Sequence, residues 1–418
     1  MSDAKIQLSL AQARRAAIEA QALDRASDDT AAILERTGFI RTLGGADVYL
    51  AARARVAGFT RSDLDTLVEQ GRFHVSPTVR GCIYLLAREH REPSLRLAEL
   101  LSARRVERDH EKVGLPTGEL AQVGEAVRQA LADGPLTTQA LRRALPDGTV
   151  RSLGDIGKKV GLSSTLPPAL RRLEFDGALE RVLDGGRLDT ERYLWRLLDG
   201  AADDAAARPV AVEDVHRHMA EVYLRAAAFG GRNGFAGWSG LGKRDAQKAL
   251  DGLDTVAVRV EGLDEPQVAL AENASTLASL AADTSGDSGP VAFLPFEDNL
   301  IALKEGPAFF VDPEHHGLQV PVWGRGKGTT LGNVRHGALR TVVAEDKLVG
   351  FWEFDPEAQS VVVGLFAGVG GETRQHIDQE AVAVGRFLRD EIGHAKSISI
   401  DNEAQMRKRC TEIRALSA

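Results

Sequence analysis

Apolar and polar positions alternate in a recurring order along the first 285 residues. In residues 119–200 the apolar spacing of a helix occurs three times and is followed by a period of two, which is typical of paired strands. A glycine turn at 184–186 joins these strands into a hairpin. The expected elements are helices at 120–131, 137–145 and 166–177 and strands at 178–183 and 187–197. Three helices followed by a hairpin is the order of a winged helix, whose last helix can enter the major groove of DNA.

The same order returns in residues 201–285. Helical spacing covers 210–226 and 235–253, and strands at 256–261 and 267–270 form a second hairpin. Repetition of one supersecondary unit predicts tandem winged helices rather than one large sheet domain.

The pattern changes to strands after residue 290. Alternating stretches at 338–344, 348–354 and 360–366 predict a meander that closes on itself as a β-barrel-like domain, and a terminal helix follows at about 373–391.

Breaks in these patterns divide the chain into four segments. Small and acidic residues without an apolar period mark linkers at 199–208 and 282–289, and Pro116 with two glycines gives a softer break at 114–118. The expected α+β domains are N-terminal helices with a first winged helix (1–118), a second winged helix (119–200), a third winged helix (201–285) and the β-barrel-like domain with its terminal helix (286–418).

Capping residues indicate where helices begin. Ser9 and Gln12 have the spacing of a capping box, and Thr137 is placed to cap the helix at 137–145. Thr60 and Asp63 predict a similar start for a helix through residue 70.

Composition narrows the class of protein. Of 418 residues, 27% are charged and 43% apolar, and no apolar run is long enough to span a bilayer. A signal peptide is not recognisable, and the two cysteines are too few for a disulfide framework. We therefore expect a cytoplasmic protein of a bacterial-type cytosol without a membrane partner. Adjacent histidines at 315 and 316 diverge on any regular element, so we expect neither a metal nor a cofactor.

The net charge of −8 is unevenly distributed. Residues 201–418 carry 22 Lys and Arg against 32 Asp and Glu, whereas residues 140–172 carry seven basic residues against two acidic ones. A locally basic stretch can bind DNA phosphates in a protein that is acidic overall.

Three groups of basic residues are candidates for DNA contact. The first group consists of basic pairs in the second winged helix, which either bind DNA phosphates or are solvated surface charges. The second group consists of four arginines between residues 41 and 80, which either clamp a DNA strand or form ion pairs with nearby aspartates. The third group lies in the glycine-rich segment 324–335, which lacks P-loop spacing. The three groups are Arg142, Arg143, Lys158, Lys159, Arg171 and Arg172; Arg41, Arg53, Arg55 and Arg80; and Arg325, Lys327 and Arg335.

Several local patterns occur in a fixed order over more than 300 residues. They are Gly38 to Arg55 followed by Gly58-Phe59-Thr60-Arg61, Arg80-Gly81, Tyr223-Leu224, Trp238-Ser239-Gly240-Leu241, Leu294-Pro295 with Asp298, and Val349-Gly350-Phe351-Trp352. In these patterns the chain resembles the winged-helix DNA glycosylases of the AlkZ/YcaQ family. The resemblance implies a C-shaped monomer that binds damaged double-stranded DNA and hydrolyses the glycosidic bond of an N7-alkylated or crosslinked purine.

The chain departs from this family at the catalytic motif. The resemblance implies Gln-x-Gln or Gln-x-Asp shortly after the turn at Leu43-Gly44-Gly45, but no glutamine follows. Aligned without a gap, Asp47 and Tyr49 take the two motif positions; alternatively, the motif has been deleted. Asp47 as a base and Tyr49 as a water-holding group would suffice for a cationic purine, whose glycosidic bond needs little acid assistance. Asp47 as a helix cap is the structural alternative.

Two functions therefore remain open from the sequence. The first is a DNA-repair glycosylase that is associated with the nucleoid when it is bound to DNA. The alternative is a winged-helix DNA-binding protein without glycosylase chemistry, acting as a damage sensor or transcriptional regulator.

Overall fold

The computed structural model describes residues 6–25, 27–198, 211–283, 289–322 and 325–416. Within it the chain forms two compact units. The larger unit comprises residues 1–67, 188–191 and 216–418, and the smaller unit comprises 68–187 and 192–215. Among the described residues, no helix has both the length and the apolar character needed to cross a membrane.

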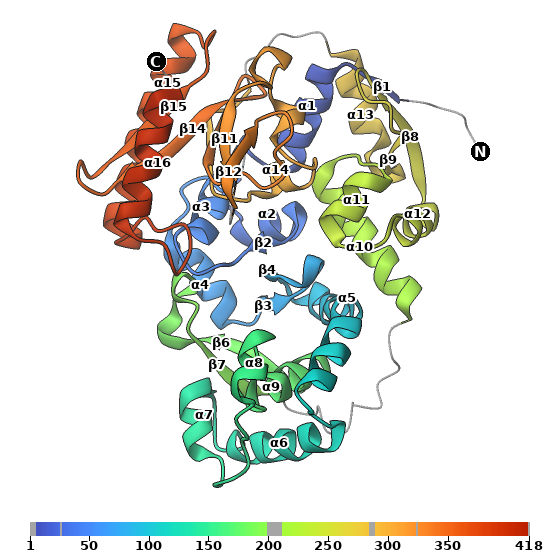
Figure 1. The fold of residues 1–418 in the computed structure, drawn as a ribbon. Coiled ribbons are helices and arrows are strands. Elements are labelled where there is room, and N and C mark those ends of the chain that lie inside the picture. The colour runs from blue at the N-terminus through green and yellow to red at the C-terminus, as the bar shows by residue number, and fades with distance from the viewer. Residues whose placement is uncertain (1–5, 26, 199–210, 284–288, 323–324, 417–418) are drawn as a thin grey trace. The chain divides into compact units, whose positions relative to one another are not determined.

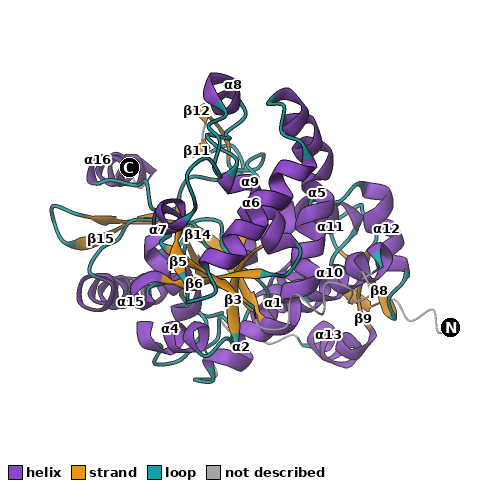
Figure 2. Ribbon diagram, turned by 90° about the horizontal axis from the view of Figure 1, so that it is seen from below, coloured by secondary structure: helices purple, strands orange, loops and turns teal. Residues whose placement is uncertain are grey.

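The described part of the smaller unit contains an antiparallel sheet and helices α5 to α9 (Figures 1 and 2). Its strands follow one another across the sheet in the order β4, β3, β6, β7, β5. They are β3 (Phe73–Pro77), β4 (Ile83–Ala87), β5 (Leu136–Thr137), β6 (Leu179–Leu183) and β7 (Tyr193–Leu197), and the helices are α5 (Arg91–Lys112), α6 (Thr117–Ala130), α7 (Thr138–Ala144), α8 (Gly154–Lys159) and α9 (Leu166–Phe175). Leucine and valine side chains of α6, α7 and α9 form one core with Trp195 of β7.

The three helices predicted in 119–200 are confirmed as α6, α7 and α9, and α8 is an additional short helix. Thr137 caps α7 by accepting a hydrogen bond from the amide of Ala140. The strands β6 and β7 pair as a hairpin, and a 3-10 turn lies at the predicted glycine turn 184–186, but the second strand begins at Tyr193 and not at residue 187. Residues 184–192 connect the two strands through two 3-10 turns, and Leu188 in the second turn is fully buried.

The first half of the larger unit contains the predicted hairpin of 256–270. Strands β8 (Thr255–Val260) and β9 (Gln267–Leu270) are antiparallel, and the N-terminal strand β1 (Ile6–Leu8) adds to β8 in parallel. Helices α10 (Val212–Ala227), α11 (Arg232–Ser239), α12 (Lys243–Asp251) and α13 (Ala274–Ala282) belong to the same region. The single helix predicted at 235–253 is wrong, because Gly240 adopts a left-handed conformation (φ 86°) that ends α11.

The C-terminal strands form an open sheet in the order β10, β13, β14, β15. These strands are β10 (Ala292–Leu294), β13 (Arg340–Ala344), β14 (Lys347–Asp355) and β15 (Ser360–Leu365), and a separate two-stranded ribbon contains β11 (Gln319–Val322) and β12 (Arg325–Thr330). The predicted closure into a barrel is wrong for the described strands, since β10 and β15 are edges that do not pair with each other. Helices pack against β15 instead (Figure 1).

Those packing helices are α15 (Gly371–Arg386), which matches the predicted terminal helix, and α16 (Glu403–Leu416), which the sequence pattern did not predict. A π-helical turn at Phe387–Ile392 continues α15 and ends at Gly393.

The N-terminal helices of the larger unit begin where the capping residues predicted. Ser9 and Gln12 form both hydrogen bonds of the capping box before α1 (Leu10–Ala20). After it come α2 (Thr30–Thr37), β2 (Ile40–Arg41), α3 (Asp47–Arg53) and α4 (Arg61–Glu69), which ends beyond the edge of the larger unit. The predicted linker at 199–208 lies entirely outside the described residues, and so does most of the linker at 282–289.

Candidate functional site

Charged side chains converge on the turn between β10 and α14 (Asn299–Ala302) in the larger unit. Asp298 caps α14 by accepting a hydrogen bond from the amide of Leu300 at 2.9 Å. The same carboxylate receives two hydrogen bonds from Arg55, at 2.7 and 2.9 Å, and both side chains are buried. Arg55 also donates to Gln21 and to the carbonyl of Ala51. The role of Arg55 in the described structure is therefore to hold this turn against α3.

Glu297 is the centre of the turn. Its backbone is left-handed (φ 57°), which is unusual for a residue with a side chain. One carboxylate oxygen accepts a hydrogen bond from Arg41 Nη1 at 2.7 Å, and the other lies 2.6 Å from Nδ1 of His336. The Glu297 side chain is only 6% exposed, whereas that of His336 is 52% exposed. Left-handed residues held in this way cluster at functional sites.

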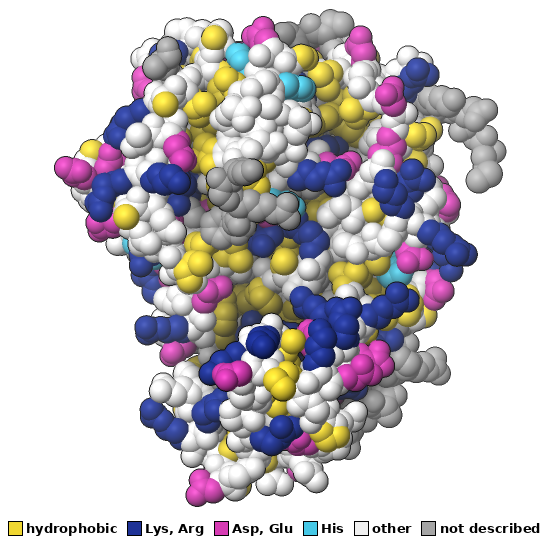
Figure 3. Space-filling view, viewed as in Figure 1, with side chains coloured by type: hydrophobic (Ala, Val, Ile, Leu, Met, Phe, Trp, Pro, Cys, Tyr) yellow, Lys and Arg dark blue, Asp and Glu magenta, His cyan; other side chains and the backbone are white. Residues whose placement is uncertain are grey.

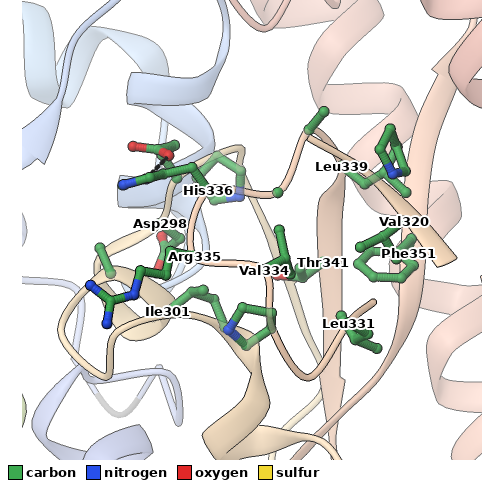
Figure 4. A pocket seen from close by; sticks show the side chains of 17 residues that line it. Asp298, Ile301, Val320, Leu331, Val334, Arg335, His336, Leu339, Thr341 and Phe351 are labelled. Atoms are coloured by element: carbon green, nitrogen blue, oxygen red, sulfur yellow. Dashed lines mark hydrogen bonds and ion pairs between the residues drawn. The ribbon is translucent and has the colours of Figure 1, made fainter. Parts of the chain in front are cut away.

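A cavity of about 40 Å³ opens beside this turn. Figure 4 shows Asp298, Arg335 and His336 at one end of the cavity and Val320, Leu331 and Phe351 at the other. Glu297 and Thr341 also line it, and the buried hydroxyl of Thr341 has no hydrogen-bond partner in the described structure. A cavity of this size holds one or two water molecules, not a nucleobase.

Asp47 contacts the same turn between β10 and α14. Its carboxylate accepts a hydrogen bond from the backbone amide of Phe296 at 2.8 Å and two from Arg340, one of them at 3.0 Å. Burial raises the pKa of the Asp47 carboxyl to about 6, against the opposing charge of Arg340. The helix-cap alternative is wrong, because Ala46 is the residue preceding α3 and the Asp47 side chain is directed to other partners.

Arg340 links Asp47 to a buried ionic network that sequence reasoning missed. It donates to Glu353 at 2.9 Å, and Glu353 is in turn paired with Arg409, which donates to Asp401 at 2.6 Å. These partners come from β13, β14, the 394–402 segment and α16. Their separation of up to about 360 residues leaves no local pattern that could have identified them.

Tyr49 makes different contacts from Asp47. Its hydroxyl donates to Asp65 at 2.6 Å and accepts a hydrogen bond from the amide of Leu188 at 2.9 Å. Burial, together with Asp65, raises the pKa of Tyr49 above its usual range. Residues two positions apart on a helix point in different directions, and the structure does not bring these two side chains together.

The loop before α3 packs tightly against the segment after α15. The amide of Ala46 donates to the carbonyl of Lys396 at 2.7 Å, and that of Ser399 donates to the carbonyl of Leu43 at 3.0 Å. Gly45 has a positive φ of 137°, and a Cβ there would lie 2.6 Å from the backbone of Ser397. A side chain therefore has no space at this position.

The predicted DNA contacts of the larger unit are mostly engaged within the protein. Arg53 pairs with Glu380 at 2.7 Å and lies over the ring of Phe387, and burial lowers its pKa. Arg335 is 68% exposed and lies 3.3 Å from Glu305. The backbones of Arg325 and Lys327 belong to β12, but their side chains lie outside the described part of the structure. For Arg41, Arg53 and Arg55, the acidic partners are not the aspartates expected from the sequence.

The predicted DNA contacts of the smaller unit are largely exposed. Most of these side chains either bond to a residue nearby in the sequence or have no hydrogen-bond or ion-pair partner in the described structure. Arg80 has a left-handed backbone, and its guanidinium donates a hydrogen bond to the hydroxyl of Tyr84. Figure 3 shows a dense group of Lys and Arg side chains over α5, which contributes five arginines of its own. Besides Arg80, the predicted DNA contacts of the smaller unit are six residues, all of them exposed. They are Arg142 (bonded to Ser164), Arg143, Lys158 (paired with Asp155), Lys159, Arg171 and Arg172 (paired with Asp176).

Metal binding has no support from side-chain geometry. Among the described residues, no group of three or more His, Cys, Asp and Glu side chains is arranged to hold an ion.

Comparisons with known proteins agree with this fold. The chain is similar to the solved structure of the DNA glycosylase AlkZ of Streptomyces sahachiroi, with a TM-score of 0.68 and 19% sequence identity over 93% of this chain and 98% of that one. No curated protein sequence matches the chain. A family model described as DNA glycosylase AlkZ-like matches residues 34–387, which is most of the chain. The chain therefore belongs to the AlkZ-like DNA glycosylase family, a family that acts on DNA.

Proposed function

We propose that the protein is a DNA-repair glycosylase that hydrolyses the glycosidic bond of N7-alkylated or crosslinked purines. The observation that carries the proposal is the polar turn at Glu297 and Asp298, with its small cavity, inside the region matched by the glycosylase family. An N7-alkylated purine is already cationic and is a good leaving group. The enzyme therefore has to place a water molecule and stabilise an oxocarbenium-like sugar, which buried charges and oriented dipoles accomplish.

Asp47 and Tyr49 remain the residues proposed from the sequence for this chemistry. Asp47 lines a second cavity of about 10 Å³ together with Arg41 and Glu297, and its raised pKa suits a proton acceptor near neutral pH. Tyr49 supports the proposal less directly, since its hydroxyl is bonded to Asp65.

DNA binding is proposed to use tandem winged helices. The order α6, β5, α7, α8, α9, β6, β7 supports one winged helix in the smaller unit, and the order α10, α11, α12, β8, β9 supports another in the larger unit. The ligand is proposed to be damaged double-stranded DNA, bound by a monomer through the exposed basic residues of the smaller unit and Arg335. The four segments 1–118, 119–200, 201–285 and 286–418 remain the proposed domains.

Release of the damaged base tests the proposal directly. Purified protein is incubated with a duplex containing N7-methyl-2′-deoxyguanosine, and free base is quantified chromatographically against spontaneous depurination. We expect release well above the spontaneous rate. We expect Asp47→Asn to lower that rate at least about 100-fold if Asp47 accepts a proton. Because Asp47 also pairs with Arg340, the thermal midpoint of the variant is measured alongside.

The alternative function is a DNA-binding protein without glycosylase chemistry, acting as a damage sensor or transcriptional regulator. The observation that favours it is the neutralisation of Asp47 by Arg340 in a chain that lacks the family's glutamine motif. Salt-dependent DNA binding without base release from any N7 adduct would establish this alternative.

A further inference from the structure

Resting on the proposed glycosylase function, but placing the general base at His336 instead of Asp47, we propose that His336 activates the hydrolytic water and that Glu297 is its positioning residue. The two side chains meet at the mouth of the 40 Å³ cavity, one from the loop before β13 and one from the turn before α14. Neither was identified as a catalytic residue from the sequence.

The contact between them fixes the tautomer of the imidazole. A carboxylate can only accept hydrogen bonds, so Nδ1 of His336 must carry the proton that lies on the 2.6 Å contact to Glu297. In the neutral ring Nε2 is then an acceptor. The His336 side chain is half exposed, so this nitrogen is accessible to water and substrate. This is the arrangement by which a carboxylate orients a histidine base in hydrolases.

The surrounding charges favour histidine over glutamate as the base. Glu297 is buried and its two carboxylate oxygens are occupied by Arg41 and by Nδ1 of His336, whereas Nε2 of His336 lies on a half-exposed side chain. Other charged groups at the cavity are Asp298, which is neutralised by Arg55, and Arg335, which faces Glu305. Histidine is also the side chain that most often serves as a general base in enzymes.

The cavity supplies a place for the water. Its volume is sufficient for one or two water molecules, and a stable buried water needs two to four polar partners. His336, Glu297 and the unpartnered hydroxyl of Thr341 all line it. The apolar wall of Val320, Leu331 and Phe351 leaves the polar end as the favourable position for water (Figure 4).

The hydrolytic step balances with these groups. The water oxygen bonds to C1′ of the sugar while the bond from C1′ to N9 of the purine breaks, and its electron pair neutralises the cationic base. One proton of the water passes to Nε2 of His336, and the resulting imidazolium is stabilised by Glu297. The products are the free alkylated purine and an abasic site.

The test is the rate of N7-methylguanine release as a function of pH, measured under single-turnover conditions with the full chain. For the wild type we expect the rate to rise with unit slope as the base loses one proton and then to level off. We expect His336→Asn to lower the plateau at least about 100-fold and to abolish this acid limb. We expect Glu297→Gln to lower the rate and to move the limb to lower pH, because the imidazolium loses its anionic partner.

Matched controls separate this result from a structural effect. His376→Asn and Glu314→Gln alter an exposed histidine and an exposed glutamate away from the cavity, and we expect both to retain the wild-type profile. Loss of stability alone would lower the amount of active protein without moving the acid limb. Two results would overturn the proposal. In the first, the wild type is active and His336→Asn releases the base at a rate within threefold of the wild-type rate. In the second, the acid limb disappears only in Asp47→Asn. No release by the wild type would instead refute the glycosylase function itself, and with it this inference.

Discussion

The buried charged network of the larger unit and the exposed basic residues of the smaller unit serve opposite purposes. In the larger unit, Asp47, Arg340 and Glu353 are buried and are bonded in one network with the partly buried Arg409, whereas in the smaller unit residues such as Arg143 and Lys159 are exposed to solvent. Buried charges must be paired, because an isolated ion in a protein interior is strongly unfavourable, so they fix the position of chain segments. Exposed cations contribute little to stability and remain available to an anionic ligand. The comparison teaches that burial, not residue type, divides structural from ligand-binding charge here.

The largest expected effect comes from breaking the buried network. Arg340→Met leaves the carboxylates of Asp47 and Glu353 without their shared partner, and we expect a loss of about 3–5 kcal/mol in the free energy of unfolding. Urea denaturation followed by circular dichroism measures it. Arg335→Met, at a 68% exposed position, serves as the control and should change stability by less than about 0.5 kcal/mol. If the two substitutions lowered the free energy of unfolding equally, burial would not distinguish structural from exposed charges in this protein.

A smaller effect is expected from Glu180 in the smaller unit, a buried carboxylate that is paired with His74 and with the exposed Arg196. Burial opposes ionisation of Glu180, but hydrogen bonds from His74 and Arg196 lower its pKa to about 2. The unfolded chain therefore binds a proton between about pH 4.5 and 2 that the folded chain does not, so stability is present above this range and is lost as the pH falls through it. We expect the free energy of unfolding to fall by up to about 3 kcal/mol over this pH range.

Denaturation at pH 5 and pH 3 measures this dependence. Glu180→Gln should lose that part of the acid sensitivity, whereas the exposed Glu125→Gln should retain it. An unchanged slope in Glu180→Gln would show that other groups carry the acid sensitivity.

The smallest effect on stability, with a marked effect on DNA binding, is expected for the exposed cations. The double variant Arg143→Gln/Lys159→Gln should change the free energy of unfolding by less than about 0.5 kcal/mol. If both residues contact phosphate, the slope of log affinity against log salt should become shallower by about 2. Fluorescence anisotropy with a labelled duplex at several salt concentrations measures this slope. Unchanged affinity and slope would remove these two residues from the DNA-binding surface.

Local sequence signals predicted the elements of the fold well where a local cause exists. Ser9 with Gln12 and Thr137 cap the helices that they were expected to cap, because capping depends on residues only three positions away. The break at Gly240 was missed although glycine is the residue that most often ends a helix in the left-handed conformation. The long connection at 184–192 was missed because the burial of Leu188 is set by tertiary packing. Barrel closure failed for the same reason: strand alternation does not specify which edges meet.

The candidate site shows the same limit. Arg41 and Asp47 drew attention as charged residues near a family-like motif, but Glu297, His336 and Arg340 lie about 250 to 300 residues further along the chain. One signal did exist, since Asp298 belongs to a pattern that carried the family resemblance. The glutamate beside it could not be distinguished from a surface residue until its left-handed backbone and its two partners were known.

The sequence by itself determined the family, the helical and strand periodicities of most of the chain and the uneven distribution of charge, because each depends on residue order or on local spacing. Tertiary structure alone decided which charges are buried. Asp47 became the partner of Arg340, and His336 met Glu297 at a cavity, because folding brought together segments that no local interaction connects. The energy of a charge depends on its surroundings, and the surroundings of these residues exist only in the folded chain.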